Sequence, residues 1–159
     1  MAMHTWFECK IRYEKVMENG MQKKVTEPYL VDALSFTEAE ARIIEEMTPF
    51  ISGEFTVSDI KRANYSELFP SDKESADRWF KCKLIFITLD EKSGAEKKTS
   101  TQVLVQAADL RDAVKKLDEG MKGTMADYQI GMVSETPLMD VYPYSAEPND
   151  KPEFDPSKA

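Results

Sequence analysis

The sequence WFECK at residues 6–10 recurs as WFKCK at residues 79–83, and four of the five positions are identical. The chain contains two tryptophans and two cysteines in total, so this repeat accounts for every residue of both types. Both residue types are uncommon in proteins. Their joint recurrence at one spacing indicates that a single structural unit occurs twice in the chain.

The repeat extends along most of the chain once single-residue changes in two loops are allowed. Asn19-Gly20 corresponds to Ser93-Gly94, and Phe69-Pro70 corresponds to Tyr142-Pro143. We therefore predict four segments: a first repeat at 3–70, a linker at 71–77, a second repeat at 78–144, and a flexible acidic, proline-rich tail at 145–159. A repeat of about 70 residues is near the lower limit for a self-sufficient core. We expect the two repeats to share a core or to pack closely.

Each repeat opens with the pattern of a half-buried strand. In the first repeat Phe7, Cys9 and Ile11 alternate with charged residues, which is the period of two that places one face of a strand in the core. Asn19-Gly20 is a favoured pair for a tight hairpin turn. A second strand should follow at residues 25–34. Its Pro28 cannot donate a ladder hydrogen bond, which places this strand at a sheet edge, at least locally.

The period then changes to that of an amphipathic helix. Apolar residues follow a helical spacing at Phe36, Ala39, Ile43 and Met47, and again at Leu110, Ala113, Leu117 and Met121. Ser35 with Glu38, and Asp109 with Asp112, have the spacing of a helix-capping pair. Third strands are predicted at 54–61 and 127–133, and short extended pieces at 65–69 and 138–142.

The predicted unit is therefore β-β-α-β, with its strands in the order second, first, third. Two such units predict an α+β fold, built by tandem duplication as a relative of ferredoxin-like folds. We expect mainly antiparallel sheet structure with two helices on one face.

Composition excludes several classes of protein. The net charge of −8 opposes nonspecific binding to nucleic acid and to anionic membranes, because both depend on Lys and Arg. No apolar run approaches the roughly 20 residues that span a bilayer, and no signal peptide is visible. Two cysteines without an export signal favour a reduced cytoplasm. Cys9 and Cys82 are best explained as small core residues, and a disulfide between them is the alternative.

The sequence offers little catalytic chemistry. The single histidine, His4, has no partner histidine, and no phosphate-binding loop, dinucleotide fingerprint or nucleophile elbow is present. Inward-facing cysteines would be inert. We predict no catalytic, metal or cofactor site, and favour a protein that is not an enzyme. Asp32 and Asp59 interrupt apolar strands, and a polar cleft formed by Asp59, Arg62 and Tyr65 is the weaker candidate site.

The stronger candidate is an interaction face. Trp6 and Trp79 should point away from the helices, and Ile85 and Ile87 extend the Trp79 face where the first repeat has charged residues. We expect a non-catalytic binding or assembly protein that uses this sheet face for a protein partner or a homodimer. A small-molecule-binding domain or enzyme with a cleft between the repeats is the alternative. Aromatic platforms also suggest binding of single-stranded nucleic acid, which the charge opposes.

One resemblance adds to these observations. The residues that carry it are Trp6-Phe7-Glu8-Cys9-Lys10, Val31-Asp32-Ala33, Glu38-Ala39 and Ser58-Asp59-Ile60-Lys61. Over residues 3–144 the sequence resembles an uncharacterised family of small Bacteroidetes proteins that is classed as a domain of unknown function. The resemblance implies no activity and no site residues.

Overall fold

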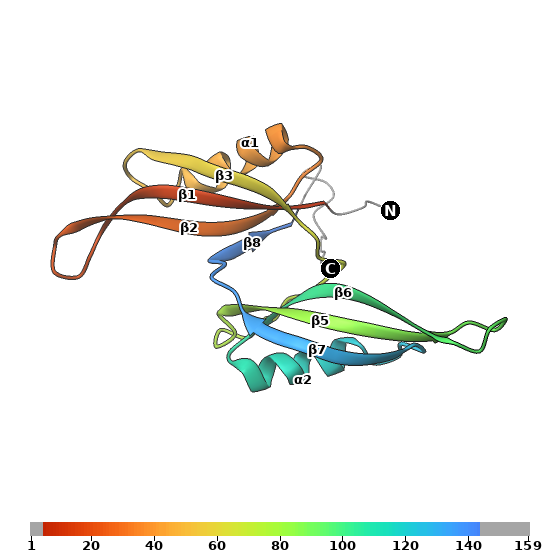
Figure 1. Cartoon of the computed structure of the whole chain (residues 1–159). Helices are drawn as coiled ribbons and strands as arrows, with labels where there is room; N and C mark the ends of the chain where they lie inside the picture. Colours follow the sequence, from red (N-terminus) through yellow and green to blue (C-terminus); the bar gives the residue numbers. More distant parts are fainter. Residues whose placement is uncertain (1–4, 144–159) are drawn as a thin grey trace, which may run out of the picture. The chain divides into compact units, whose positions relative to one another are not determined.

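The structure of the protein is a computed structural model that describes residues 5–143 (Figure 1). The chain forms two compact units. Unit 1 contains the residues up to Ala63 together with those from Asp140 onward, and unit 2 is the continuous segment Asn64–Met139. The predicted tail at 145–159 lies outside the described residues.

Unit 1 is a four-stranded sheet with one helix. Its elements are β1 (Trp6–Val16), β2 (Gln22–Asp32), α1 (Phe36–Met47), β3 (Phe55–Ala63) and β8 (Asp140–Tyr142). The strand order is β3-β1-β2-β8. β1 pairs antiparallel with β2 and β3, while β8 adds a parallel strand beside β2.

Unit 2 repeats this arrangement. Its elements are β4 (Glu67–Phe69), β5 (Arg78–Leu89), β6 (Glu96–Ala107), α2 (Leu110–Gly120) and β7 (Asp127–Glu135). The strand order is β4-β6-β5-β7, with β4 parallel to β6 and the other pairs antiparallel. The α+β class, the mainly antiparallel pairing and the predicted order second, first, third are confirmed.

The strand and turn patterns of the sequence explain these elements. In β1 the side chains of Phe7, Cys9 and Ile11 are fully buried. The residues that alternate with them, Glu8, Lys10 and Arg12, are more exposed. Gly20 has φ +83° in the β1–β2 hairpin, a conformation that side chains other than glycine adopt at a cost. Pro28 lies one residue before the β8 pairing begins at Tyr29. The predicted edge therefore holds at Pro28 and the residues of β2 before it, and only residues 29–31 of β2 lie between β1 and β8.

The prediction of two helices on one face was wrong, because each sheet carries its own helix. α1 packs on β1, β2 and β3, and α2 packs on β4, β6 and β7. On the helix side of each sheet the buried side chains form a cluster of their own. One cluster surrounds Phe7 and Ile43, and the other surrounds Phe80 and Leu117.

The compact units differ from the predicted repeats at two places. β4 closes the first predicted repeat but pairs in unit 2, and β8 closes the second predicted repeat but pairs in unit 1. The predicted linker at 71–77 is also part of unit 2. Its Ala76 is buried, and the N–H of Ser71 donates to Oε1 of Gln106 at 2.9 Å.

Both helices begin at the predicted capping residues. Oγ of Ser35 accepts from the N–H of Glu38 at 3.1 Å, and Oδ1 of Asp109 accepts from the N–H of Asp112 at 2.8 Å. In return, the Glu38 carboxylate accepts from the N–H of Leu34. These bonds satisfy backbone donors that the first turn of a helix leaves without partners.

Replacing Asp109 with alanine is expected to lower the free energy of unfolding by about 1 kcal/mol, because the first turn of α2 loses its side-chain acceptor. Urea denaturation measures this change. Asp109→Asn is the matched control, since asparagine keeps an acceptor oxygen at the same place and should retain most of the stability. Equal losses in both variants would contradict the capping role.

Candidate functional site

The sequence-predicted interaction face is only partly open. Trp6 and Trp79 lie on the sheet faces away from the helices, but their exposed fractions are 4% and 5%. The indoles therefore do not form open stacking platforms, and this part of the prediction was wrong. Ile85 and Ile87 are half-buried. A Cβ atom at Gly131 would lie 2.9 Å from Cδ1 of Ile85, so the isoleucine lies directly over the glycine of β7.

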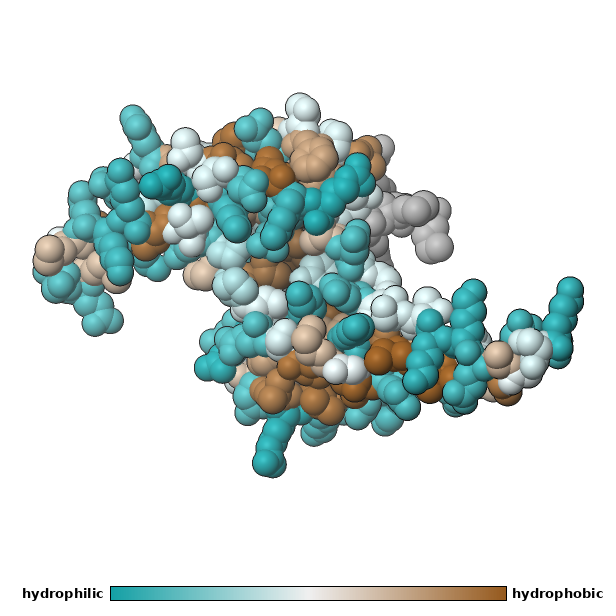
Figure 2. Space-filling model, viewed as in Figure 1, coloured by the Kyte–Doolittle hydropathy of each residue, from teal (hydrophilic) through white to brown (hydrophobic). Residues whose placement is uncertain are grey.

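Two further apolar side chains extend this face. Leu89 is 69% exposed and Met132 is 42% exposed, on the same side of the β5–β7 pair as Ile85 and Ile87. Figure 2 shows hydrophobic side chains between hydrophilic ones along this part of unit 2. We call Ile85, Ile87, Leu89 and Met132 the sheet-face stripe.

The predicted polar cleft is not assembled in unit 1. Asp59 is exposed on β3 opposite Lys10, while the Arg62 guanidinium lies 5.5 Å from the ring centre of Phe7, on the helix side of the sheet. Residues three apart on a strand face opposite sides. Asp59 and Arg62 therefore do not share a site. Tyr65 belongs to unit 2 and is half-buried.

Asp32 has a structural role that the sequence analysis did not foresee. Its side chain is 3% exposed, and Oδ1 accepts from the N–H of Thr5 at 3.1 Å. Its backbone oxygen accepts from the Arg42 guanidinium of α1. These bonds fix the end of β2 against the start of β1 and against the helix.

The two thiols are buried and free, in separate core clusters. Removal from water raises the pKa of Cys9 to about 12 and that of Cys82 to about 11. Thiolates at these positions are strongly disfavoured. Neither cysteine can serve as a nucleophile near neutral pH, which agrees with the prediction of inert core residues.

These pKa values predict a loss of stability in alkali. The unfolded thiols titrate near 9, so their contribution is complete below pH 9 and is lost as the pH rises through the folded-state values of about 11 and 12. The urea midpoint should stay level from pH 7 to 9 and then fall. A Cys9→Ala, Cys82→Ala double variant should fall less steeply above pH 9. Identical slopes in the two proteins would contradict the assignment.

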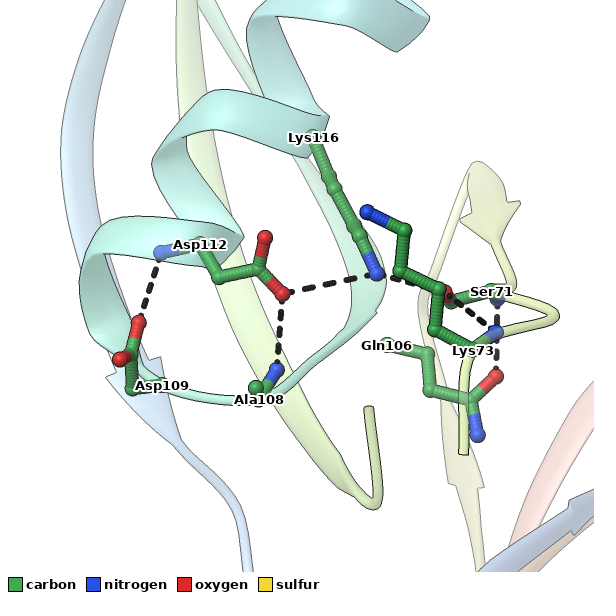
Figure 3. A network of polar contacts seen from close by, with 7 residues as sticks. All are labelled: Ser71, Lys73, Gln106, Ala108, Asp109, Asp112 and Lys116. Atoms are coloured by element: carbon green, nitrogen blue, oxygen red, sulfur yellow. Dashed lines mark hydrogen bonds and ion pairs between the residues drawn. The ribbon is translucent and has the colours of Figure 1, made fainter. Parts of the chain in front are cut away.

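A polar network joins α2 of unit 2 to the segment that follows β4 (Figure 3). Nζ of Lys116 donates to Oγ of Ser71 at 2.5 Å and lies 3.5 Å from the carboxylate of Asp112. Ser71 in turn donates its N–H to Gln106 of β6. The Lys116 side chain is 14% exposed. The backbone N–H of Ala108 donates to Asp112 and, with Lys116, lowers the pKa of this carboxyl group.

Unit 1 has an equivalent arrangement. Arg42 and Lys116 are each the seventh residue of their helix, and Asp32 and Gln106 each pair with the tryptophan of their unit. Arg42 donates to the backbone oxygen of Pro143 at 3.0 Å, just after β8. In both units a helix cation therefore fastens the segment that follows the added parallel strand. The Lys116 network therefore has a structural role, which is to hold the segment after β4 against α2.

Beside this network lies a hollow of about 730 Å³, which we call the lysine hollow. Its walls are the segment after β4 and the C-terminal half of α2: Phe69, Pro70, Ser71, Asp72, Lys73, Lys116, Glu119 and Gly120. The lining therefore carries two cationic and two anionic side chains. This balance gives no strong preference for the charge of a ligand.

A second hollow of about 420 Å³ also has Phe69 in its lining, and we call it the phenylalanine hollow. Its apolar wall is formed by Phe69, Leu84, Phe86, Val103 and Met121, and its remaining lining by Ser66, Glu67, Thr101, Gly120 and Thr124. Phe69 and Gly120 line both hollows. A Cβ atom at Gly120 would lie 2.8 Å from the Phe69 ring, so glycine lets this ring lie against the helix.

The Ser71–Lys116 contact has the short distance of a catalytic Ser–Lys pair but lacks its chemistry. Activation of a serine requires a neutral amine that can accept the hydroxyl proton. Lys116 instead donates to Ser71 and forms an ion pair with Asp112, and an ammonium group only donates hydrogen bonds. Within residues 5–143 no group of His, Cys, Asp and Glu side chains could hold a metal ion.

Sequence reasoning missed Phe69, Ser71, Lys116 and Gly120. The signal that could have found the phenylalanine hollow is a difference between the repeats. Where unit 1 has Tyr29 and Glu27, unit 2 has the smaller Val103 and Thr101 at the same register positions. That comparison requires the strand register, which the sequence alone leaves open.

The fold and the site define a two-unit α+β protein with two helices and two mixed, mostly antiparallel sheets. A family model described as "Domain of unknown function (DUF4494)" matches residues 5–144, and the chain belongs to this family. Membership in a domain-of-unknown-function family, expected from the resemblance, is confirmed. No curated protein and no solved structure matches the chain. No helix in the described part of the chain is long and apolar enough to cross a membrane.

Proposed function

We propose that the protein is a non-catalytic binding protein and that unit 2 holds a small molecule at the hollows beside Phe69. The observation that carries the proposal is the loss of side-chain volume relative to unit 1. Val103, Thr101 and Gly120 stand where unit 1 has Tyr29, Glu27 and Glu46. The hollow of about 420 Å³ among these residues has the size and mainly apolar lining of small-molecule sites.

A thermal-shift panel of aliphatic, aromatic and charged small molecules tests this proposal. A ligand at 100 times its dissociation constant adds about 2.7 kcal/mol of stability, which is several degrees for a domain of this size. Val103→Tyr should abolish the shift, because it restores the ring that unit 1 carries. Val16→Tyr is the matched control at a residue that is 64% exposed in unit 1. A panel without any ligand, or a shift that Val103→Tyr leaves unchanged, would contradict the proposal.

The sheet-face stripe supports a second candidate, association of two copies of the chain through β7. β7 is the outer strand of its sheet and has no charged residue between Asp127 and Glu135. β3, the corresponding edge of unit 1, carries Asp59, Lys61 and Arg62, the kind of charge that prevents edge pairing. A strand that pairs with its own copy is a self-complementary surface, as a symmetric dimer requires.

Light scattering on the wild type and on Ile87→Asp tests the dimer. The wild type should have the mass of two chains and Ile87→Asp that of one. Met125→Asp, at a residue that is 98% exposed, is the control and should remain dimeric. A wild type with the mass of one chain would remove this candidate.

We also infer that the two units arose by tandem duplication of a β-β-α-β unit related to ferredoxin-like folds. The matching strand orders support this inference. So do register shifts at corresponding places, between Lys10 and Ile11 and between Lys83 and Leu84. The two free thiols support the cytoplasmic location expected from the sequence.

A further inference from the structure

The two units can be compared residue by residue, because their strand registers agree. Cys9 pairs with Tyr29 and Ile11 with Glu27 in unit 1, as Cys82 pairs with Val103 and Leu84 with Thr101 in unit 2. The added parallel strands agree as well. Tyr142 pairs with Val31, two residues after Tyr29, and Phe69 pairs with Val105, two residues after Val103. Tyr142 and Phe69 are therefore structural counterparts.

Unit 1 has a tyrosine ring at the position where unit 2 has a hollow. The Tyr29 ring stacks on Tyr142, with ring centres 6.2 Å apart and planes inclined by 22°. Its hydroxyl donates to Oε1 of Glu27 at 3.3 Å, and the Tyr13 hydroxyl donates to the same oxygen at 2.8 Å. Unit 1 thus contains a phenol that is stacked on one side and hydrogen-bonded at its oxygen.

Unit 2 keeps the surroundings of this phenol but lacks the phenol itself. Phe69 provides the stacking ring, while Val103 replaces the tyrosine and leaves the phenylalanine hollow beside it. The hydroxyl of Thr101 stands in place of the Glu27 carboxylate and lies 2.9 Å from Oγ of Ser66. Thr101 donates to Ser66, and Ser66 in turn donates to the backbone oxygen of Gln102 at 3.2 Å. The two hydroxyl oxygens are therefore left as acceptors for the O–H of a phenol.

The charge of the lining narrows the ligand further. Glu67 is the one charged side chain among the residues that line the hollow. A carboxylate at the rim disfavours anionic ligands and favours neutral or cationic ones. A bound ligand displaces water from the hollow, and this strengthens the attraction between a cationic ligand and the Glu67 carboxylate.

We propose that the phenylalanine hollow binds a small molecule with a 4-hydroxyphenyl group, either neutral or bearing an amine. The ring stacks on Phe69 against Val103 and Met121, and the hydroxyl bonds to the Thr101–Ser66 pair. The Glu67 carboxylate in the lining favours an amine over a carboxylate on the substituent of the ring. This assignment rests on the proposed function and gives it a ligand class.

Isothermal titration calorimetry with p-cresol and tyramine tests the assignment. Both should bind the wild type, and 3-(4-hydroxyphenyl)propionate should bind at least tenfold more weakly than tyramine because of Glu67. Val103→Tyr should abolish binding of both ligands, and Val16→Tyr should leave it unchanged. Absence of binding to the wild type, or binding retained in Val103→Tyr, would overturn the assignment.

Thr101→Val provides a second test that does not add volume to the core. It should weaken p-cresol about tenfold and leave toluene unchanged, because only the phenol uses the hydroxyl pair. Equal effects on both ligands would overturn the hydrogen-bonding part of the assignment. If aliphatic compounds bind in a manner that Val103→Tyr abolishes and p-cresol does not bind, the ligand class is wrong and the proposed function stands. If no compound in the panel binds, both are wrong.

Discussion

Phe7→Ala is expected to lower the free energy of unfolding of unit 1 by about 3–5 kcal/mol, the usual cost of removing a fully buried phenylalanine. The Phe7 side chain is 0% exposed and lies in the cluster that joins β1 to α1. Its ring meets the Phe36 ring edge-on at 4.9 Å, and the Arg62 guanidinium lies above it. The alanine variant loses the apolar transfer energy, leaves a cavity and removes both ring contacts.

Urea denaturation followed by circular dichroism measures this loss. Phe50→Ala is the matched control, since Phe50 is 77% exposed and its truncation should change stability by less than about 0.5 kcal/mol. Similar midpoints for the two variants would show that Phe7 is not the centre of the unit 1 core.

Val141→Asp should also cost about 3 kcal/mol or more, although it alters a strand of three residues. Val141 is 7% exposed and pairs with the fully buried Leu30. A carboxylate without a partner is strongly disfavoured at such a site. The substitution is therefore expected to release β8 and leave β2 without its parallel neighbour.

Amide hydrogen exchange can locate this effect. Protection should fall in β2 near Tyr29–Val31 and in α1, where Arg42 loses its bond to Pro143. Met139→Asp is the control, because Met139 is 49% exposed and precedes the paired residues. A Val141→Asp protein with wild-type protection in β2 would mean that β8 contributes nothing to unit 1.

Local patterns in the sequence were sufficient to predict most elements. The alternation around Cys9 and the caps at Ser35 and Asp109 each have a local physical cause, and each was confirmed. The hairpin at Asn19-Gly20 was also confirmed, but its loop covers residues 17–21 and only Gly20 has a positive φ, so the turn is not the tight two-residue type. The strand order could also be predicted. The connection from β2 through α1 to β3 joins two parallel strands, and β1, the hairpin partner of β2, fits between them.

The destinations of β4 and β8 could not be predicted in the same way. Three-residue strands carry no periodicity, and their partners lie far away in sequence. The sequence placed each short strand with the repeat that precedes it, because nothing local distinguishes the two sheets. For the same reason the alternation of Trp6 and Trp79 gave their face of the sheet correctly but not their burial.

The candidate site was hidden for a related reason. A hollow is a difference between neighbouring side chains, and the neighbours of Phe69 come from β6, β5 and α2. When the repeats are compared only by whether a position is apolar, Val103 looks like any other core residue. Only the register, which sets it opposite Cys82 as Tyr29 is set opposite Cys9, reveals the missing ring.

The placement of β8 also sets an order of events during translation. The ribosome releases every strand of unit 2 before it releases residues 140–142, which complete the sheet of unit 1. Unit 2 can therefore finish folding on the growing chain while β2 still presents an unpaired edge beside Tyr29–Val31. The half of the protein that is made first is thus the half that matures last.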